Sequence, residues 1–201
     1  MYEVTESSLL LDASIVAVRR DAVTMPRRVA HRDVVEHFGS AAVVAYDGER
    51  IALIRQYRHA LGRRLWELPA GLLDVPGESA LDAARRELWE ETGLRARTWG
   101  MLLDLATSPG MSDEATRIYL ATDLSTVERP EPEDEEADME LAWVPLDEAK
   151  RMVLRGEIVN SIAVAGIFAA AEGAARSAES PFDLRPYALA RRRDGAGGNL
   201  A

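Results

Sequence analysis

The beginning of the 201-residue chain alternates apolar and polar residues in short segments separated by charged positions. A period of two is typical of half-buried β-strands. We expect short strands at residues 14–18, 22–25 and 33–37, which together would form a small antiparallel sheet. A sheet of this size has too little core to fold by itself. It should therefore pack on the main body or on a second subunit.

Longer apolar runs follow and predict the strands of a main sheet. A run at residues 41–45 precedes Asp47-Gly48, which is a favourable hairpin turn into a second strand at residues 51–59. Another strand at residues 65–68 is broken by Pro69. Later strands are expected at residues 99–105, 117–121 and 141–144.

A helical pattern begins at Ser79, a suitable N-cap with Asp82 three positions later. Gly93 stands where a glycine commonly follows the end of a helix. Apolar residues at helical spacing form the buried stripe of this helix, namely Leu81, Ala84 and Leu88. Two more helices are expected, at residues 146–154 and 160–175. Strands before, between and after the helical segments indicate a mixed α/β sandwich.

These elements divide the chain into three parts. Residues 1–38 would form the N-terminal β-sheet, which serves dimerisation or substrate support, and residues 39–176 the main domain. Residues 177–201 are rich in arginine and glycine, and we expect this tail to be partly disordered.

The composition is that of an ordinary globular protein, with 47% hydrophobic and 29% charged residues. A net charge of −10 argues against nucleic acid or an anionic membrane as the main partner. The absence of cysteine excludes disulfides, zinc–thiolate sites and thiol nucleophiles. The start of the chain lacks signal-peptide features, and the apolar run at residues 162–171 is about half the length that a bilayer requires. We therefore expect a cytoplasmic protein.

The segment Arg86–Leu94 is the most informative part of the chain, because three glutamates and an arginine occupy its first six residues. On a helix, Glu87 and Glu91 share one face and Glu90 lies alongside. Like charges at this spacing repel each other by roughly a few tenths of a kcal/mol. A solvated acidic helix face is the simplest interpretation. A hard divalent cation would remove the repulsion, and it suits ligands that are all oxygen.

The spacing from Glu78 to Leu94 resembles the signature of the Nudix hydrolases, because every fixed residue of that stretch is present. In this family a loop–helix–loop presents glutamates that bind Mg²⁺ or Mn²⁺ against a substrate diphosphate. The sequence departs from the family pattern at one point. Six residues rather than five separate Gly71 from Glu78, which we interpret as a one-residue insertion in the loop.

The resemblance implies a Nudix-type α/β/α sandwich with a mixed sheet and a set of metal ligands. Glu87 and Glu91 would be ligands, Glu90 would share or support a second ion, and the carbonyl of Ala70 would complete the set. Arg86 would orient the glutamates through charge-assisted hydrogen bonds rather than contact the substrate. Two or more divalent ions can neutralise a diphosphate and activate water for attack at phosphorus.

Residues outside this segment resemble the ADP-ribose pyrophosphatase subgroup. Pro109, in Ser108-Pro109-Gly110, lies fifteen residues after Leu94, as in that subgroup. The alternative is an ordinary turn. By resemblance, Arg58 would contact the phosphates, and Glu67 or Glu114 the adenine or ribose side. Arg32 could reach the site from the N-terminal sheet.

An acidic segment at residues 128–140 holds eight carboxylates and one arginine. Such a stretch is commonly a solvated, mobile loop. The subgroup is similar in placing a glutamate from a loop opposite the metal site, where it acts as general base or completes the metal shell. Glu136 is our candidate and Glu135 the alternative.

The resemblance implies Mg²⁺-dependent hydrolysis of ADP-ribose to AMP and ribose 5-phosphate, with Mn²⁺ as a possible substitute. It also implies a homodimer in which the N-terminal sheet helps to bind adenine. Two alternatives stay open. The substrate could be another nucleoside diphosphate derivative, such as a nucleotide sugar or a dinucleotide, or the protein could be a nucleotide-binding sensor without turnover.

Overall fold

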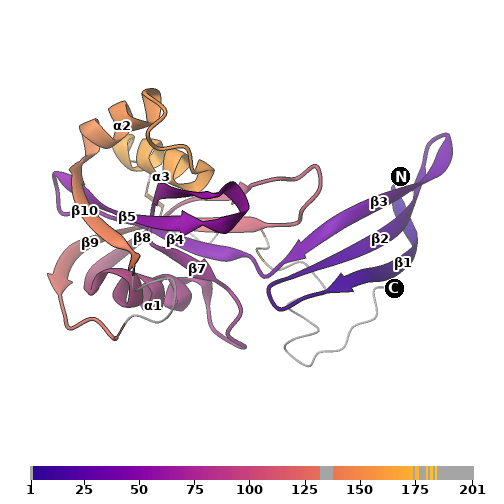
Figure 1. The fold of residues 1–201 in the computed structure, drawn as a ribbon, viewed down its shortest axis with the longest axis horizontal. Coiled ribbons are helices and arrows are strands. Elements are labelled where there is room, and N and C mark those ends of the chain that lie inside the picture. The colour runs from indigo at the N-terminus through magenta and orange to yellow at the C-terminus, as the bar shows by residue number, and fades with distance from the viewer. Residues whose placement is uncertain are drawn as a thin grey trace.

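The computed structural model describes residues 2–131, 138–173, 175, 176, 180, 182 and 184. It consists of a layered body and an N-terminal arm that projects from one end of it (Figure 1). The arm is an antiparallel sheet with the strand order β1-β2-β3, in which the strands are β1 (Glu3–Asp12), β2 (Val16–Met25) and β3 (Arg28–His37). The prediction of a small antiparallel sheet at the N-terminus is confirmed.

Two details of the predicted arm are wrong. The sequence pattern did not predict β1, because almost all of its residues are exposed and no alternating buried face marks it as a strand. Residues 14–18 and 22–25 were expected to be separate strands, but residues 16–25 form the single strand β2. Of the three charged residues between them, Arg19 and Asp21 are buried and Arg20 is exposed, and all three belong to the strand rather than to a turn.

In the described residues, the body contains two sheets, three α-helices and the short 3-10 helix η1. The strand order of the first sheet is β7-β4-β9-β8; β4 and β9 run parallel and the other pairs antiparallel, so this sheet is mixed. The second sheet is antiparallel with the order β10-β5-β6. The elements are β4 (Ser40–Ala45), β5 (Arg50–Arg58), η1 (His59–Leu61), β6 (Arg63–Glu67), β7 (Ala70–Leu72), α1 (Ala80–Thr92), β8 (Leu94–Ala106), β9 (Ala115–Thr126), β10 (Glu140–Pro145), α2 (Leu146–Leu154) and α3 (Ser161–Ala171).

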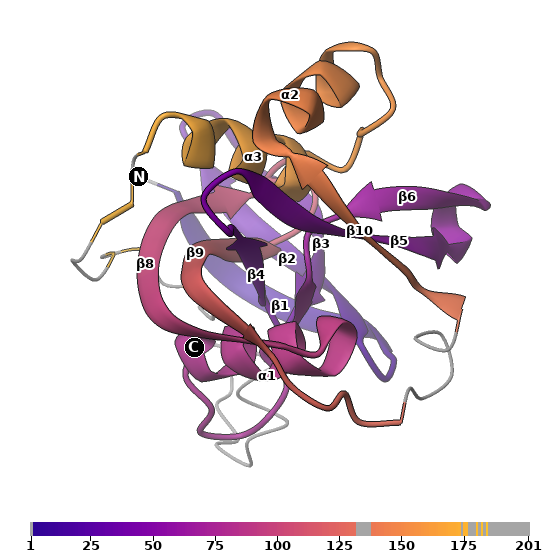
Figure 2. The same cartoon turned by 90° about the vertical axis from the view of Figure 1, so that its left-hand side faces the viewer.

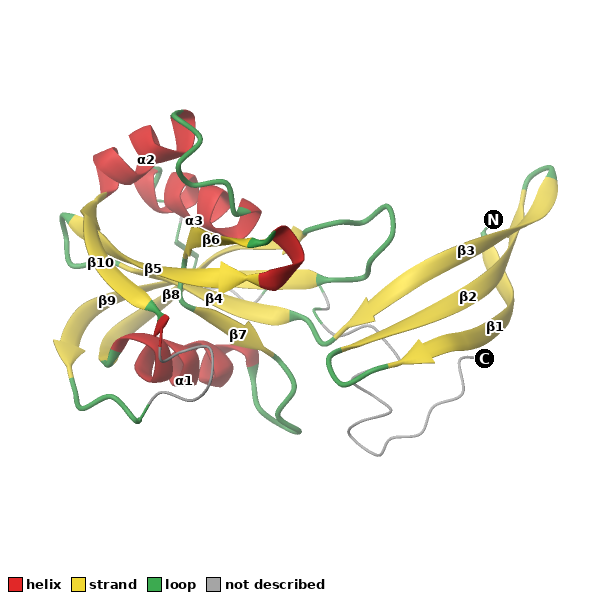
Figure 3. Ribbon diagram, viewed as in Figure 1, coloured by secondary structure: helices red, strands yellow, loops and turns green. Residues whose placement is uncertain are grey.

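Helices lie on both sides of the sheets, as the α/β/α prediction requires. Figures 1 and 3 show α1 below the sheets and α2 and α3 above them. Figure 2 shows the same layers from one end, with the strands between the helices. Strand β4 is buried on both faces. Its residues Ala41 and Val43 pack into the core cluster that contains α1, and Ala42 and Val44 into the cluster that contains α3. Burial on both faces explains its continuous apolar run.

Most of the strands and helices predicted for the body are confirmed, and the differences are in length. The sequence did not predict β7, a three-residue strand after Pro69, because so short a strand has no periodicity. Strands β8 and β9 extend well beyond the predicted ranges, and α3 ends at Ala171 rather than at residue 175. Within the described residues, no helix combines the length and the apolar character that a membrane span requires.

Candidate active site

Helix α1 carries the glutamate cluster, and its ends are capped as predicted. Ser79 Oγ accepts a hydrogen bond from Asp82 N at 3.1 Å. Gly93 follows the helix with a φ angle of 67°, a left-handed conformation that glycine adopts without strain. These caps define the first and last turns of the helix. They therefore define which face presents its glutamates to the neighbouring strand.

Arg86 connects three carboxylates on and before α1. Its Nε and Nη2 atoms each donate to the carboxylate of Glu78 at 3.0 Å. Its Nη1 donates to Glu87 Oε1 at 2.5 Å and to Glu90 Oε2 at 3.0 Å. These bonds, those to Glu78 first among them, raise the pKa of Arg86, although burial opposes the change. Arg86 thus hydrogen-bonds three glutamates, and its role in orienting them as metal ligands stays a prediction.

Glu91 and Glu87 face β7, the edge strand of the mixed sheet. Glu91 is only 6% exposed, and its Oε2 accepts a hydrogen bond from Ala70 N at 2.9 Å. The Glu87 carboxylate lies directly against Gly71, where any side chain would overlap it. Glycine at this position therefore lets the carboxylate approach the backbone of β7, and a side chain there would displace Glu87 from its present position.

The electrostatic environment of Glu87 favours a bound cation. Burial raises the pKa of Glu87, and the negative charges of Glu90 and Asp74 raise it further, whereas Arg86 lowers it. A cation close to the carboxylate would reverse these effects.

The donor set fits a hard divalent ion, since the clustered side chains Glu78, Glu87, Glu90 and Glu91 offer only oxygen. Within the described part of the chain, no three acidic or histidine side chains already meet at a point suited to an ion. Glu136, the predicted base and ligand, and its alternative Glu135 lie outside the described residues.

Arg58 and Glu67, predicted to contact different parts of the substrate, form an ion pair with each other. Arg58 Nη2 donates to Glu67 Oε2 at 2.6 Å, and Arg58 Nε donates to Oε1 at 3.0 Å. Gln56 Nε2 adds a longer bond to the same carboxylate at 3.3 Å. Glu67 is 3% exposed, whereas the side chain of Arg58 is 42% exposed. Of the two, Arg58 is the one that solvent can reach.

A cleft of about 600 Å³ lies between the arm and the loop that precedes β9. Among the predicted substrate-binding residues, Arg32 of the arm and Glu114 of the loop line this cleft. Ser108 is at the start of the same loop, where its carbonyl accepts hydrogen bonds from Met111 N at 3.0 Å and Ser112 N at 2.9 Å. The structure thus brings Arg32 and Glu114 to one cleft, with Ser108 at the base of its loop.

Strand register places this loop and the glutamate cluster at the same end of the mixed sheet. Ser40 in β4 pairs with Leu72 of β7 on one side and with Thr116 of β9 on the other. Adjacent strands are about 4.8 Å apart, so β7, which contacts Glu87, lies roughly 10 Å from the start of β9. The 108–114 loop leads directly into that start.

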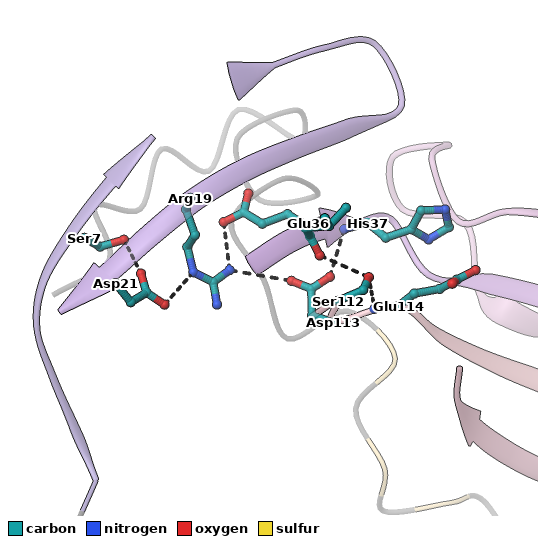
Figure 4. Close-up of polar contacts among 9 residues, drawn as sticks. Ser7, Arg19, Asp21, Glu36, His37, Ser112, Asp113 and Glu114 are labelled. Atoms are coloured by element: carbon teal, nitrogen blue, oxygen red, sulfur yellow. Dashed lines mark hydrogen bonds and ion pairs between the residues drawn. The ribbon is translucent and has the colours of Figure 1, made fainter. Parts of the chain in front are cut away.

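Sequence reasoning missed two residues of this region, Arg19 and Asp113, which also line the cleft. Figure 4 shows both within a buried network of polar side chains where the arm meets the loop. Neither lies in a recognisable motif, and their separation of more than ninety positions gives no local signal. An arginine and an aspartate within a strand pattern, Arg19 and Asp21, were the available hint that charge is buried there.

The family of this chain follows from comparison with known proteins. The NUDIX domain family matches residues 36–162, which include the glutamate helix and most of the body. The chain belongs to this family.

Relatives within the family are similar over most of their length. The chain is 57% identical over 170 residues to a protein named ADP-ribose pyrophosphatase from Mycobacterium tuberculosis (strain ATCC 25618 / H37Rv), with 84% of this chain and 82% of the relative covered. It is 32% identical over 154 residues to an ADP-ribose pyrophosphatase of Bacillus subtilis (strain 168), covering 76% and 83%. A crystal structure of an ADP compounds hydrolase has the same fold, with a TM-score of 0.72, 20% identity and coverage of 86% and 93%.

Proposed function

We propose that this protein hydrolyses the diphosphate of ADP-ribose, giving AMP and ribose 5-phosphate. The observation that carries the choice of substrate is the 57% identity, across 84% of the chain, to a protein named for this activity. The glutamates that Arg86 hydrogen-bonds form an all-oxygen donor set, which suits the divalent ions that diphosphate hydrolysis needs. Water adds to one phosphorus, the bridging P–O bond breaks, and the bridging oxygen leaves with the other phosphate.

The roles that we assign to the site residues are those that the resemblance to the family implies. Glu87, Glu90 and Glu91, together with the carbonyl of Ala70, would hold Mg²⁺, and Mn²⁺ could substitute. The metal would neutralise the diphosphate and lower the pKa of the attacking water. Arg86 keeps the glutamates in position through its bonds to Glu78, Glu87 and Glu90. Glu136, with Glu135 as the alternative, would accept the proton of the water.

The rest of the substrate would occupy the cleft between the arm and the 108–114 loop. Arg58 would contact the phosphates, and Arg32 would reach the site from the arm. Of the alternatives Glu67 and Glu114 for the adenine or ribose side, we favour Glu114, because Glu67 is buried and paired with Arg58. The placement of Arg32 and Glu114 on one cleft supports this orientation.

A substrate panel tests the proposal. The purified protein is incubated with Mg²⁺ and ADP-ribose, nucleotide sugars or dinucleotides, and the nucleotide and phosphorylated products are separated by chromatography. ADP-ribose should have the highest kcat/KM and yield AMP. A higher kcat/KM for another nucleoside diphosphate derivative would transfer the assignment to that compound. No turnover of any compound, with nucleotide binding retained, would favour the sensor.

We further propose that the protein is a cytoplasmic homodimer joined through the arm. The arm exposes several large apolar residues, which its own small core does not cover. Exposed apolar surface of this kind is typical of a protein–protein interface. The exposed residues are Tyr2, Val4, Leu9, Leu10, Leu11, Ile15 and Val29. Light scattering should give twice the monomer mass. Replacing Leu9 and Leu11 by Ser should produce monomers, and an unchanged mass would exclude this surface.

A further inference from the structure

The arm and the 108–114 loop are connected by backbone hydrogen bonds along β3. Val35 N donates to Met111 O at 2.8 Å, and Asp113 N donates to Val35 O at 3.2 Å. Ser112 Oγ adds a bond to the same carbonyl at 3.1 Å. The loop is therefore attached to β3 through a single parallel β-bridge between Val35 and Ser112.

Side chains reinforce this connection around a buried arginine (Figure 4). Arg19 Nε donates to Asp21 Oδ2 and Arg19 Nη1 to Glu36 Oε1, both at 2.9 Å. Asp113 Oδ1 accepts from His37 N at 2.8 Å, and its Oδ2 lies 3.6 Å from Arg19 Nη1. We call this group, Arg19, Asp21, Glu36, His37 and Asp113, the arm joint.

Asp113 is the least satisfied acid of the arm joint. Its side chain is 5% exposed, yet its Oδ2 accepts no hydrogen bond from any described residue and meets Arg19 only at ion-pair distance. Glu36 is completely buried and also faces Arg19, so a single guanidinium serves several carboxylates. Among Asp21, Glu36 and Asp113, only Asp113 belongs to the body. Its side chain connects to the arm through the bond from His37 N and the longer ion pair with Arg19.

Hydrogen bonds within the loop connect Asp113 to Glu114 and to the two ends of the loop. Glu114 is the next residue; its N donates to Ser112 Oγ at 3.1 Å, and its carboxylate accepts from Thr107 Oγ1 at 2.5 Å. Thr107 N also bonds to Glu114 O at 3.3 Å, which closes the loop on itself. A loop closed in this way moves as a unit when its attachment moves.

We propose that Asp113 is a positioning residue for substrate binding: through Arg19 and the backbone of His37 it fixes the 108–114 loop, and with it Glu114, against the arm. The inference rests on the proposed function, because it assumes that this loop contacts the substrate. Asp113 would not contact the substrate. Its effect would therefore appear in KM and in loop mobility rather than in the chemical step.

Protonation of Asp113 gives a second readout. Burial raises the pKa of Asp113 to about 6. The groups around it are Arg19 and Asp21 on β2, Glu36 and His37 on β3, and Glu114 on its own loop, while Ser7 of β1 binds Asp21. Burial lowers the pKa of His37, so this side chain adds no positive charge near neutrality. Protonation removes the cost of burying this charge, and that gain exceeds the loss of attraction to Arg19, so the loop should be held more firmly in mild acid.

The test compares Asp113→Ala, which removes both contacts, with Asp113→Asn, which retains an oxygen for His37 N and loses the charge. In Asp113→Ala, amide hydrogen exchange in residues 108–114 should accelerate roughly tenfold, and KM for ADP-ribose should rise roughly tenfold with kcat within about twofold. In Asp113→Asn, the exchange rate and KM should both be close to the wild-type values. This variant should also lose the change in KM across pH 6. Arg20→Ala, which breaks an exposed pair on the same strand, is the matched control and should change neither the exchange rate nor KM.

Unchanged exchange and KM in Asp113→Ala would overturn the proposal, as would a loss confined to kcat. Ser112→Ala, which removes one bond to Val35 O, gives the same comparison if Asp113→Ala does not fold, and is expected to shift exchange and KM in the same direction. Exchange does not depend on turnover. A wild-type protein that fails to hydrolyse ADP-ribose therefore refutes the proposed function, while the exchange data still decide whether Asp113 holds the loop.

Discussion

Two clusters in this molecule have the same composition, one arginine among three carboxylates, but different surroundings. Arg86 with Glu78, Glu87 and Glu90 lies on and beside α1, and the exposure of these side chains ranges from 12% to 29%. Arg19 with its three carboxylates lies at the arm joint, and there the range is 0% to 11%. The first comes from thirteen consecutive residues and the second from three separate parts of the chain.

This difference shows how one set of groups can serve two purposes. Partly exposed carboxylates retain access to ions and substrate, and a fourth carboxylate, Glu91, adds negative charge that the single arginine does not neutralise. The carboxylates of the arm joint are engaged by Arg19 and the backbone of His37, and their contribution is to fix the arm relative to the loop. We therefore expect the α1 cluster to affect kcat, and the arm joint to affect stability and, through the loop, KM.

The largest effect should come from Glu91→Gln. The glutamine retains an oxygen for Ala70 N but removes the charge needed by a cation, so kcat should fall on the order of 10³-fold while stability changes by less than about 1 kcal/mol. Steady-state kinetics with ADP-ribose and Mg²⁺ measure kcat, and urea unfolding measures the stability. Glu148→Gln, on the exposed face of α2, is the control. Retained turnover would exclude a metal role for Glu91.

Stability distinguishes the two clusters next. Arg19→Met removes the guanidinium that pairs with the buried Asp21, Glu36 and Asp113, which should lower the free energy of unfolding by about 3–5 kcal/mol. Arg20→Met, one position away, breaks a pair whose side chains are 47% and 51% exposed and should lower it by less than about 1 kcal/mol. Urea unfolding at neutral pH compares them. Equal losses would mean that the arm joint is no more than a surface network.

Metal affinity should respond to the other arginine. Arg86→Ala frees Glu87 and Glu90 to rotate, so we expect the Mg²⁺ concentration that gives half-maximal activity to rise about 10- to 100-fold. Arg85→Ala changes the neighbouring arginine, which bonds to the exposed Asp82 instead, and should leave the Mg²⁺ dependence unchanged. An identical shift in both variants would show that the general charge of α1, rather than the bonds of Arg86, controls the metal.

The same comparison explains what the sequence could predict. The glutamates of α1 repeat at helical spacing, so Glu87 and Glu91 could be placed on one face, with Glu90 alongside, from the sequence alone. Strands β4 and β5 were also predictable, because burial on both faces left continuous apolar runs. By contrast, β1 exposes nearly every residue and offered no pattern.

Contacts between distant segments were not predictable. The arm joint unites residues 19, 36 and 113, and their proximity depends on how β3 meets the loop before β9. The pairing of Arg58 with Glu67 likewise follows from the register of β5 with β6, in which the two lie on the same face of adjacent strands. Spacing along the chain carries no information on such pairings.

The smallest effect, and the most specific to the arm joint, is a pH dependence of stability. The pKa of Asp113 is about 6 in the folded protein against an ordinary value of 3.8, so the folded state binds this proton more tightly. Stability from this group is complete below about pH 4 and is lost as the pH rises through about 6. Between about pH 5 and pH 7.5, wild type should therefore lose about 1 kcal/mol more than Asp113→Asn. Urea unfolding at the two pH values measures this, and parallel losses in both proteins would place the titration elsewhere.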